Sequence, residues 1–290
     1  MEANLAELKK GGFLKQVQSD YFAVRLRVAG GNLTLGQLET IQRVATKYGQ
    51  GYVHLTTRQG MEIPFIRLRD VENVRQELLA GGVRLGVCGG TVRGVMACQG
   101  SALCPHGLID GKELAGQIDD AFYAAPVPGK FKISVTGCPR SCAKPQENDL
   151  GFEAAVIPAC HTESCIACGI CAEACLAGAI SLAAGLPVIV REKCTRCGDC
   201  LAACPTGAWR AAQVGVKVWA GGRIGRDPKL GEAVVSFLPL EQLPKIIETT
   251  LTFFRQYGKT RERFGKTLER VGKERYLEAL QPYIYGSSGF

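Results

Sequence analysis

The spacing of the cysteines is the feature of this 290-residue sequence with the clearest chemical meaning. Nine of the fourteen cysteines lie between residues 160 and 212, and eight of these form two copies of a Cys-x-x-Cys-x-x-Cys-x-x-x-Cys run, displaced by 29 positions. The first copy consists of Cys165, Cys168, Cys171 and Cys175, and the second of Cys194, Cys197, Cys200 and Cys204. Thiolates are soft ligands that suit iron, and close spacing lets one loop wrap a cluster. The repeat therefore predicts iron–sulfur chemistry.

The repeat resembles that of bacterial two-cluster ferredoxins, in which the fourth cysteine of each run binds the other cluster. The resemblance implies one [4Fe-4S] cluster on set one, which is Cys165, Cys168, Cys171 and Cys204. It implies a second cluster on set two, which is Cys194, Cys197, Cys200 and Cys175. Leu176 stands where the second copy has Pro205, and we expect this to change the turn more than the ligation. A pair of zinc sites is the alternative, although zinc sites normally show isolated Cys-x-x-Cys pairs.

Four further cysteines precede the repeat in two pairs, and we call them set three. Cys98 and Cys104 are separated by five residues, and Cys138 and Cys142 by three, the latter within Gly-Cys-Pro-Arg-Ser-Cys. These spacings resemble the signature of sirohaem-dependent sulfite and nitrite reductases. In that family the four thiolates hold one [4Fe-4S] cluster and the last also binds the sirohaem iron, so the resemblance implies that Cys142 is the bridge. A structural cluster without haem is the alternative from the cysteines alone.

Several basic residues follow the order of that family's motifs. Arg25-Leu26-Arg27 precedes two glycines, Thr56-Thr57-Arg58-Gln59 begins the next segment, Arg93 lies five residues before Cys98, and Lys130-Phe131-Lys132 leads into Cys138. Sirohaem is rich in carboxylates and sulfite is an anion; arginine offers bidentate hydrogen bonds, and lysine a compact charge and a proton. The resemblance implies substrate binding by Arg27, Arg93, Lys130 and Lys132, and sirohaem binding by Thr56, Arg58, Gln59 and Cys142. Arg140 departs from the asparagine of many relatives.

Strands and helices in alternation have to position these residues. Hydrophobic periodicity predicts strands over 21–28, 52–57, 61–66, 130–136, 150–157 and 214–220. It predicts helices that begin at Thr34 and Asp70, and further helices over 110–124, 240–257 and 260–279. Pro158 is expected to end the strand before it. The initial order β-α-β-β-α indicates an α+β fold.

The abrupt change of composition after Pro158 predicts an insertion. Residues 1–80 are expected to form the ferredoxin-like half-domain of the sulfite and nitrite reductases. Residues 81–158 and 213–290 are expected to form an α/β sheet domain that binds sirohaem and its [4Fe-4S] cluster. Residues 159–212 are expected to form the inserted two-cluster ferredoxin domain.

Composition and charge predict a cytoplasmic protein with no membrane span. The longest apolar run, 179–190, is interrupted by Ser181, Gly185 and Pro187 and is shorter than the ~20 residues of a membrane helix. The first fifteen residues lack the apolar core of a secretory signal, so the cysteines are expected to be reduced metal ligands rather than disulfides. The net charge of +8 is spread along the chain, and its densest cluster, 255–275, is interleaved with glutamates and predicts a solvated helix face. We expect no nucleic-acid partner.

Other residues are predicted to have no chemical role. Cys88 and Cys160 remain after twelve ligands are assigned, and buried inert thiols are the commoner case. His54, His106 and His161 are isolated and are expected to be structural.

The resemblance implies six-electron reduction of sulfite to sulfide by a protein with sirohaem and three [4Fe-4S] clusters. Two clusters would relay electrons from a low-potential donor protein, either a ferredoxin or a dedicated reductase subunit, as in the anaerobic and dissimilatory-type branch. Nitrite reduction to ammonia on the same cofactor is an alternative, and retention of Lys132 favours sulfite. A non-catalytic electron-transfer subunit is another. A homodimer or higher oligomer is expected, because larger family members build one site from two homologous halves and this chain shows one set of each part.

Overall fold

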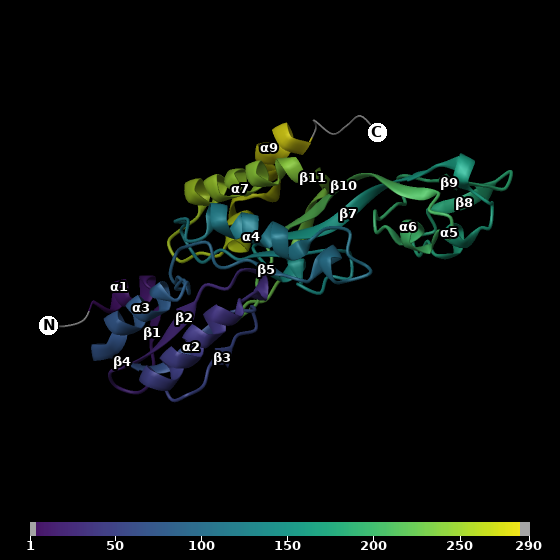
Figure 1. Ribbon diagram of the computed structural model, residues 1–290. Helices are drawn as coiled ribbons and strands as arrows, with labels where there is room; N and C mark the ends of the chain where they lie inside the picture. Colours follow the sequence, from purple (N-terminus) through teal and green to yellow (C-terminus); the bar gives the residue numbers. More distant parts are fainter. Residues whose placement is uncertain (1–3, 285–290) are drawn as a thin grey trace.

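A computed structural model describes residues 4–284 of the protein. Figure 1 shows three bodies in a row: an amino-terminal half-domain (residues 4–80), a central domain, and a cysteine-rich module (residues 160–209) at the opposite end from the half-domain. The overall class is the predicted α+β, with both antiparallel and parallel strand pairs.

The half-domain is a four-stranded antiparallel sheet in the order β1-β2-β4-β3. Its strands are β1 (Phe13–Lys15), β2 (Tyr21–Leu26), β3 (His54–Leu55) and β4 (Met61–Arg67), and its helices are α1 (Leu5–Lys10), α2 (Leu35–Tyr48) and α3 (Val71–Ala80). Alternate residues of β2 are buried, because successive side chains of a strand point to opposite faces. Phe22, Val24 and Leu26 enter the core, so Arg25 and Arg27 lie on the other face.

The two helix starts predicted in the half-domain have different outcomes. Thr34 caps α2 as expected: its hydroxyl accepts from the Gln37 backbone N–H, and the Gln37 side-chain oxygen accepts from the Thr34 backbone N–H. Asp70 precedes α3 but its side chain makes no capping hydrogen bond. Leu35, in the first turn of α2, is 78% exposed.

The central domain contains a five-stranded mixed sheet in the order β11-β10-β7-β6-β5. Its strands are β5 (Met96–Ala97), β6 (Ile133–Thr136), β7 (Leu150–Cys160), β10 (Trp209–Ala220) and β11 (Glu232–Pro239). Strands β5, β6 and β7 run parallel, whereas β7, β10 and β11 are antiparallel. Every residue of β6 is buried, as expected of a parallel strand covered on both faces. Strand β11 was not predicted.

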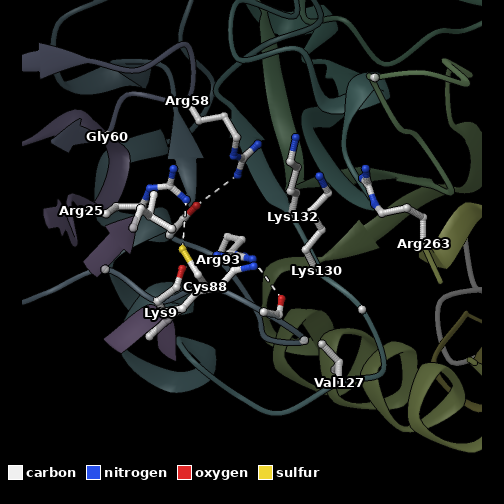
Figure 2. Close-up of a pocket in the computed structure, with 18 of the residues that line it drawn as sticks. Lys9, Arg25, Arg58, Gly60, Cys88, Arg93, Val127, Lys130, Lys132 and Arg263 are labelled. Atoms are coloured by element: carbon white, nitrogen blue, oxygen red, sulfur yellow. Dashed lines mark hydrogen bonds between the residues drawn. The ribbon is translucent and has the colours of Figure 1, made fainter. Parts of the chain in front are cut away.

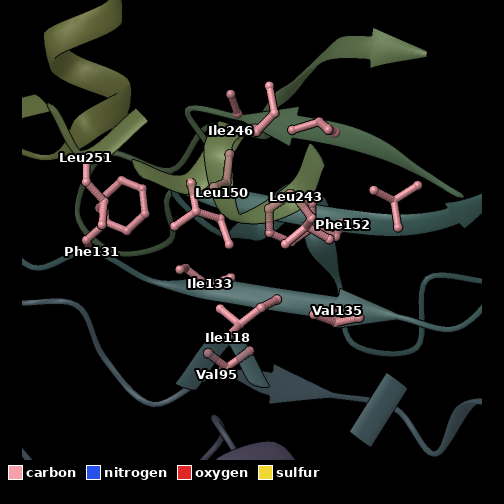
Figure 3. Packing of buried hydrophobic residues seen from close by; sticks show 14 of the residues in the cluster. Val95, Ile118, Phe131, Ile133, Val135, Leu150, Phe152, Leu243, Ile246 and Leu251 are labelled. Carbon is pink, nitrogen blue, oxygen red and sulfur yellow. The ribbon is translucent and has the colours of Figure 1, made fainter. Parts of the chain in front are cut away.

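Helices cover this sheet: α4 (Gly111–Phe122), α7 (Leu243–Tyr257), α8 (Phe264–Val271) and α9 (Lys273–Ile284). Figure 3 shows the packing: side chains of β6 and β7, such as Ile133, Leu150 and Phe152, meet Leu243 and Ile246 of α7. The single helix predicted over 260–279 is wrong, because Gly272 adopts a left-handed φ of 99° and separates α8 from α9.

The cysteine-rich module is attached through two long strands. Strands β7 and β10 stay paired from Leu150 with Ala220 to Cys160 with Trp209, so the two-stranded ribbon runs into the module (Figure 1). The module itself holds α5 (Ile170–Glu173), α6 (Asp199–Ala203) and the hairpin β8 (Ile180–Ala183) and β9 (Leu186–Ile189).

The expected end of a strand at Pro158 is wrong. β6 pairs only with Leu150 to Glu153 of β7, so beyond that point one edge of β7 faces no strand. A proline, which cannot donate a backbone hydrogen bond, is tolerated at such an edge. The predicted domain boundaries, 158/159 and 212/213, therefore fall within β7 and β10.

Candidate active-site cleft and cysteine sets

A cleft of about 1390 Å³ lies between the half-domain and the central domain, and the charged residues of its walls are basic apart from Asp227 (Figure 2). We call it the cationic cleft. Its arginines and lysines are Lys9, Lys10, Arg25, Arg27, Arg58, Arg93, Lys130, Lys132, Arg223, Arg226, Arg261, Arg263 and Lys266. Figure 2 shows Lys130, Lys132 and Arg263 side by side, with their charged ends pointing the same way. The cleft is therefore suited to a ligand with several negative charges.

Lys130 and Lys132 owe their direction to the strand that follows them. The intervening Phe131 is fully buried and packs against Phe254 and Phe264, so the two lysines on either side of it turn outward into the cleft. Neither ammonium forms an ion pair with a carboxylate among residues 4–284. Burial, followed by the nearby charges of Arg58, Arg263 and Lys130, lowers the pKa of Lys132 to about 8.

Arg58 reaches from the loop between β3 and β4 into the central domain. Its guanidinium donates to the side-chain oxygen of Asn148 and to the carbonyls of Gly94 (3.1 Å) and Ile133 (3.3 Å). None of these partners carries a charge, and burial lowers the pKa of Arg58 to about 10. A buried cation held only by neutral acceptors leaves its positive charge available to an anion.

Arg93 lies just before β5 and is held in a similar way. Its guanidinium donates to the carbonyl oxygens of Val87 and, at 2.9 Å, of Gly89. Its Nε is buried and has no hydrogen-bond partner in the described chain. A buried donor without a partner costs free energy, so a ligand oxygen at this position would be stabilising.

The other predicted substrate residue, Arg27, lines the cleft but is already paired. Its Nε donates to Asp119 Oδ2 at 2.6 Å and its terminal nitrogen to Asp120 at 2.8 Å, and its guanidinium lies 4.3 Å from the centre of the Tyr123 ring. Arg27 therefore lines the same cleft as the other predicted substrate residues, but two carboxylates neutralise its charge.

Two further residues predicted to bind sirohaem differ in position: Thr56 lines the cleft and Gln59 does not. Thr56 Oγ1 accepts from the Gly60 amide N–H at 3.0 Å and closes a tight turn. The Gln59 amide forms two hydrogen bonds with the backbone of Ala97, at 2.7 and 2.9 Å. Because Ala97 immediately precedes Cys98, Gln59 joins the half-domain to the strand that carries a predicted cluster ligand.

Sequence patterns missed several residues of the cleft, among them Arg263 and Cys88. Arg263 donates twice to the fully buried Asp149, at 3.1 and 2.8 Å, although the two are 114 positions apart. Cys88, predicted to be inert, lines the cleft with its Sγ 3.3 Å from an Arg25 nitrogen. Part of the basic cluster 255–275, predicted to be solvated, faces the cleft instead. No local pattern could have revealed these contacts, because each joins segments distant in the chain.

The cysteines of set three gather at the carboxyl ends of β5 and β6. Cys98 follows β5 directly, and its Sγ accepts from the Gly137 amide N–H at 3.0 Å. Burial raises the pKa of the Cys138 thiol, and Cys98, Cys104 and Cys142 lie close enough to raise it further. Cys142 is exposed. Since β5 and β6 are parallel, their carboxyl ends meet at one edge of the sheet, as the predicted ligand set requires.

Sets one and two lie around two separate small cavities in the cysteine-rich module. Cys165, Cys168, Cys171 and Cys204 line the first, and Cys175, Cys194, Cys197 and Cys200 line the second. In each case the fourth thiol comes from the other copy of the repeat, in the grouping that the sequence predicted. Within residues 4–284 no three His, Cys, Asp or Glu side chains are close enough to hold a single metal ion. Four thiols spread around a space are the donor set that an iron–sulfur cluster needs.

Comparisons with known proteins agree with this geometry. The family model "Nitrite and sulphite reductase 4Fe-4S domain" matches residues 88–286, and "Nitrite/Sulfite reductase ferredoxin-like half domain" matches 14–81. Coenzyme F420-dependent sulfite reductase of Methanocaldococcus jannaschii is 35% identical over 87% of this chain, which spans only 40% of that relative. One subunit of the anaerobic sulfite reductase of Salmonella typhimurium is 30% identical, over 80% of this chain and 74% of the relative.

Among solved structures, dissimilatory sulfite reductase I has the same fold, with a TM-score of 0.74 and 21% identity over 90% of this chain and 69% of the other. No helix in the described part of the chain is long and apolar enough to cross a membrane. Because both family models match, in the expected order, the chain belongs to the sirohaem-dependent sulfite and nitrite reductase superfamily.

Proposed function

We propose that this protein reduces sulfite to sulfide at a sirohaem coupled to a [4Fe-4S] cluster. The observation that carries the proposal is that Arg58, Arg93, Lys130 and Lys132 line the cleft and have no carboxylate partner in residues 4–284. Like charges brought together in a partly buried cleft repel one another, and anions bound among them remove that cost. Substrate and sirohaem carboxylates are both anions of this kind.

The roles of the residues follow from their positions. Sirohaem, when bound through Cys142, would supply the iron that binds the substrate sulfur and delivers electrons to it. Arg93, Lys130 and Lys132 are proposed to bind the oxygens of sulfite, with Lys132 as a proton donor because its pKa of about 8 lies near neutrality. Arg58 and Thr56 are proposed to bind sirohaem carboxylates. Gln59 and Arg27 are proposed to hold the walls of the cleft in place, since both side chains are occupied by protein partners.

Electrons are proposed to reach this site through clusters bound by sets one and two, which brings the total to three [4Fe-4S] clusters. In this scheme residues 1–80 form the half-domain, 81–158 with 213–290 bind sirohaem, and 159–212 are the inserted relay. A low-potential ferredoxin or reductase subunit would supply the electrons, as in anaerobic and dissimilatory-type reductases. All fourteen cysteines are free, which suits iron ligation in a reducing cytoplasm.

We further propose that the active protein is at least a homodimer. Arg93 and Lys132 precede the first residues of β5 and β6, whereas Cys98 and Cys138 follow their last residues. The four residues of β6 alone span roughly 13 Å, so cations and cysteines leave opposite ends of the same strands. A two-fold partner that contributes its cations to the exposed Cys142 of the first subunit would complete each site.

The visible spectrum of the purified protein, with iron and sirohaem counts, tests the proposal. Sirohaem bands together with twelve iron atoms in clusters are expected from three four-iron clusters. Clusters without sirohaem would contradict it and indicate an electron-transfer subunit. Steady-state rates with sulfite and nitrite then separate the two substrates. Both Lys130 and Lys132 face the cleft, and this favours the more highly charged sulfite.

A further inference from the structure

The cysteine-rich module touches the central domain through the loop that carries set two. The Val156 amide N–H donates to the Arg196 carbonyl at 3.0 Å, and the Arg196 guanidinium lies 5.7 Å from the centre of the Phe237 ring. Gly198 packs closely against Leu108: a side chain added at Gly198 would place its Cβ 2.9 Å from Leu108 Cδ2. The cysteines that flank Gly198 in this loop, Cys197 and Cys200, both line the set-two cavity.

Leu108 continues this contact toward set three. Its backbone N–H donates to the Gly137 carbonyl at 2.7 Å, and the Gly137 N–H donates to Cys98 Sγ at 3.0 Å. Gly137 also directly precedes Cys138. A short, packed series therefore leads from the Gly198 loop through Leu108 and Gly137 to two cysteines of set three.

The first copy of the repeat offers an internal comparison. Gly169 occupies the position that Gly198 has in the second copy, and both adopt a left-handed backbone, with φ of 80° and 82°. A Cβ on Gly169 would meet Leu182 of the module's own hairpin at 3.4 Å, an ordinary contact, and no residue of the central domain. Set one has an exposed side: Cys168 is exposed, and Ile166, which follows Cys165, is 65% exposed.

We propose that electrons enter the module at set one and leave it from set two across the junction of Gly198 with Leu108, which makes Leu108 a positioning residue for the last transfer. The inference rests on the proposed function, because it requires clusters on all three sets. Electron tunnelling weakens steeply with distance and with gaps in packing. The one set whose loop is packed against the route to set three is therefore the set that passes electrons on.

The proposed order of electron transfer, from set one through set two to set three, can be tested without turnover by electron paramagnetic resonance of the reduced protein. Neighbouring paramagnetic clusters broaden each other's signals, and this broadening falls steeply with distance. Cys197→Ser, which removes a set-two ligand, should narrow the set-three signal, whereas Cys168→Ser, which removes a set-one ligand, should leave it unchanged. Narrowing by Cys168→Ser, or none by Cys197→Ser, overturns the order. Absence of sirohaem or of the set-three cluster from the parent protein would instead refute the proposed function.

The junction itself is tested by a matched pair of variants. Gly198→Ala and Gly169→Ala impose the same left-handed strain, but only the first pushes a methyl group against Leu108. After flash photoreduction of the module, we expect the sirohaem band to respond about tenfold more slowly in Gly198→Ala than in Gly169→Ala, since small displacements at a reacting contact cost large factors in rate. Leu108→Ala, with unchanged iron content, should show the same slowing. Parental rates in Gly198→Ala and Leu108→Ala would overturn the inference.

Discussion

The cationic cleft and the cysteine-rich module hold their proposed cofactors by opposite means. The module draws both sets of thiols from a single stretch of chain, Cys165 to Cys204, with short loops and helices supplying all of them. The cleft draws its side chains from positions as far apart as Lys9 and Lys266, and it exists only where the half-domain packs against the central domain.

The cleft therefore depends on the packing of two domains, whereas the module depends on its own short segment of chain. Arg58 and Gln59 cross from the half-domain to the central domain by hydrogen bonds to Gly94, Ile133 and Ala97, so a shift between the domains would disturb both. The module depends on its own repeat and on the contacts near Gly198. Damage to the module should therefore leave the cleft intact, whereas damage to the cleft should abolish the chemistry.

The largest effect is expected from separating the two halves of the proposed composite site. Arg93→Ala and Cys142→Ser homodimers should each lose essentially all sulfite reduction, one through its substrate cation and the other through its sirohaem ligand. A mixed dimer of the two variants contains one intact site, made from the unaltered cation set of one subunit and the unaltered cysteines of the other. Activity should therefore return to about half of the parent value, measured as sulfide formed per dimer.

The controls for this experiment are differential tagging, which proves that heterodimers have formed, and a mixture of two Arg93→Ala subunits carrying both tags. The second mixture should stay inactive. No recovery in proven heterodimers of the first kind would show that each site is built within one chain.

Cys168→Ser should have the next largest effect, and it tests directly whether the module can be damaged without damage to the cleft. Removing a set-one ligand should slow turnover with a protein donor by about tenfold or more, because the proposed entry point of the electrons is lost. The sirohaem spectrum should be largely unchanged, because set three lies in another domain. Absorption spectra and donor-dependent rates measure the two properties; loss of sirohaem would contradict a separable module.

The same contrast explains what the sequence could and could not predict. Thiols such as Cys165 and Cys194 are grouped by short-range spacing, and the structure places them in the predicted sets. Strand β2 and helix α2 were likewise predictable from periodicity and a capping residue. Arg263 was not predictable, because its place in the cleft depends on a pairing with Asp149 formed by the folding of α8 over the sheet.

A smaller effect is expected on stability, where Arg27 and Lys130 should behave differently although both line the cleft. Arg27 compensates Asp119, whose side chain is 1% exposed, so Arg27→Ala leaves a buried carboxylate alone and should destabilise the protein by about 3 kcal/mol. Lys130→Ala removes an unpaired cation and should change stability by less than about 0.5 kcal/mol. Denaturant midpoints measure both. Partial recovery of stability in Arg27→Ala/Asp119→Asn would confirm that the uncompensated Asp119 carboxylate is the cause. Equal losses of stability in Arg27→Ala and Lys130→Ala would exclude it.

The smallest expected effect is a pH dependence that originates in Lys132. Burial and neighbouring cations lower its pKa from an ordinary 10.5 to about 8, so the free protein loses this charge as pH rises through 8. The Michaelis constant for sulfite should then rise a few-fold between about pH 7 and 9, since one anion-binding cation is lost. The free energy of unfolding should increase over a similar pH range. The pKa of Lys132 is lower in the folded protein, so the unfolded chain binds more protons between about pH 8 and 10.5, and the folded state becomes more stable there as pH rises. Lys132→Arg stays charged over the whole range, so it should remove the rise in the Michaelis constant while leaving any effect of the substrate's own ionisation in place. Parallel pH profiles for the parent and Lys132→Arg would show that Lys132 does not bind the substrate as a titrating cation.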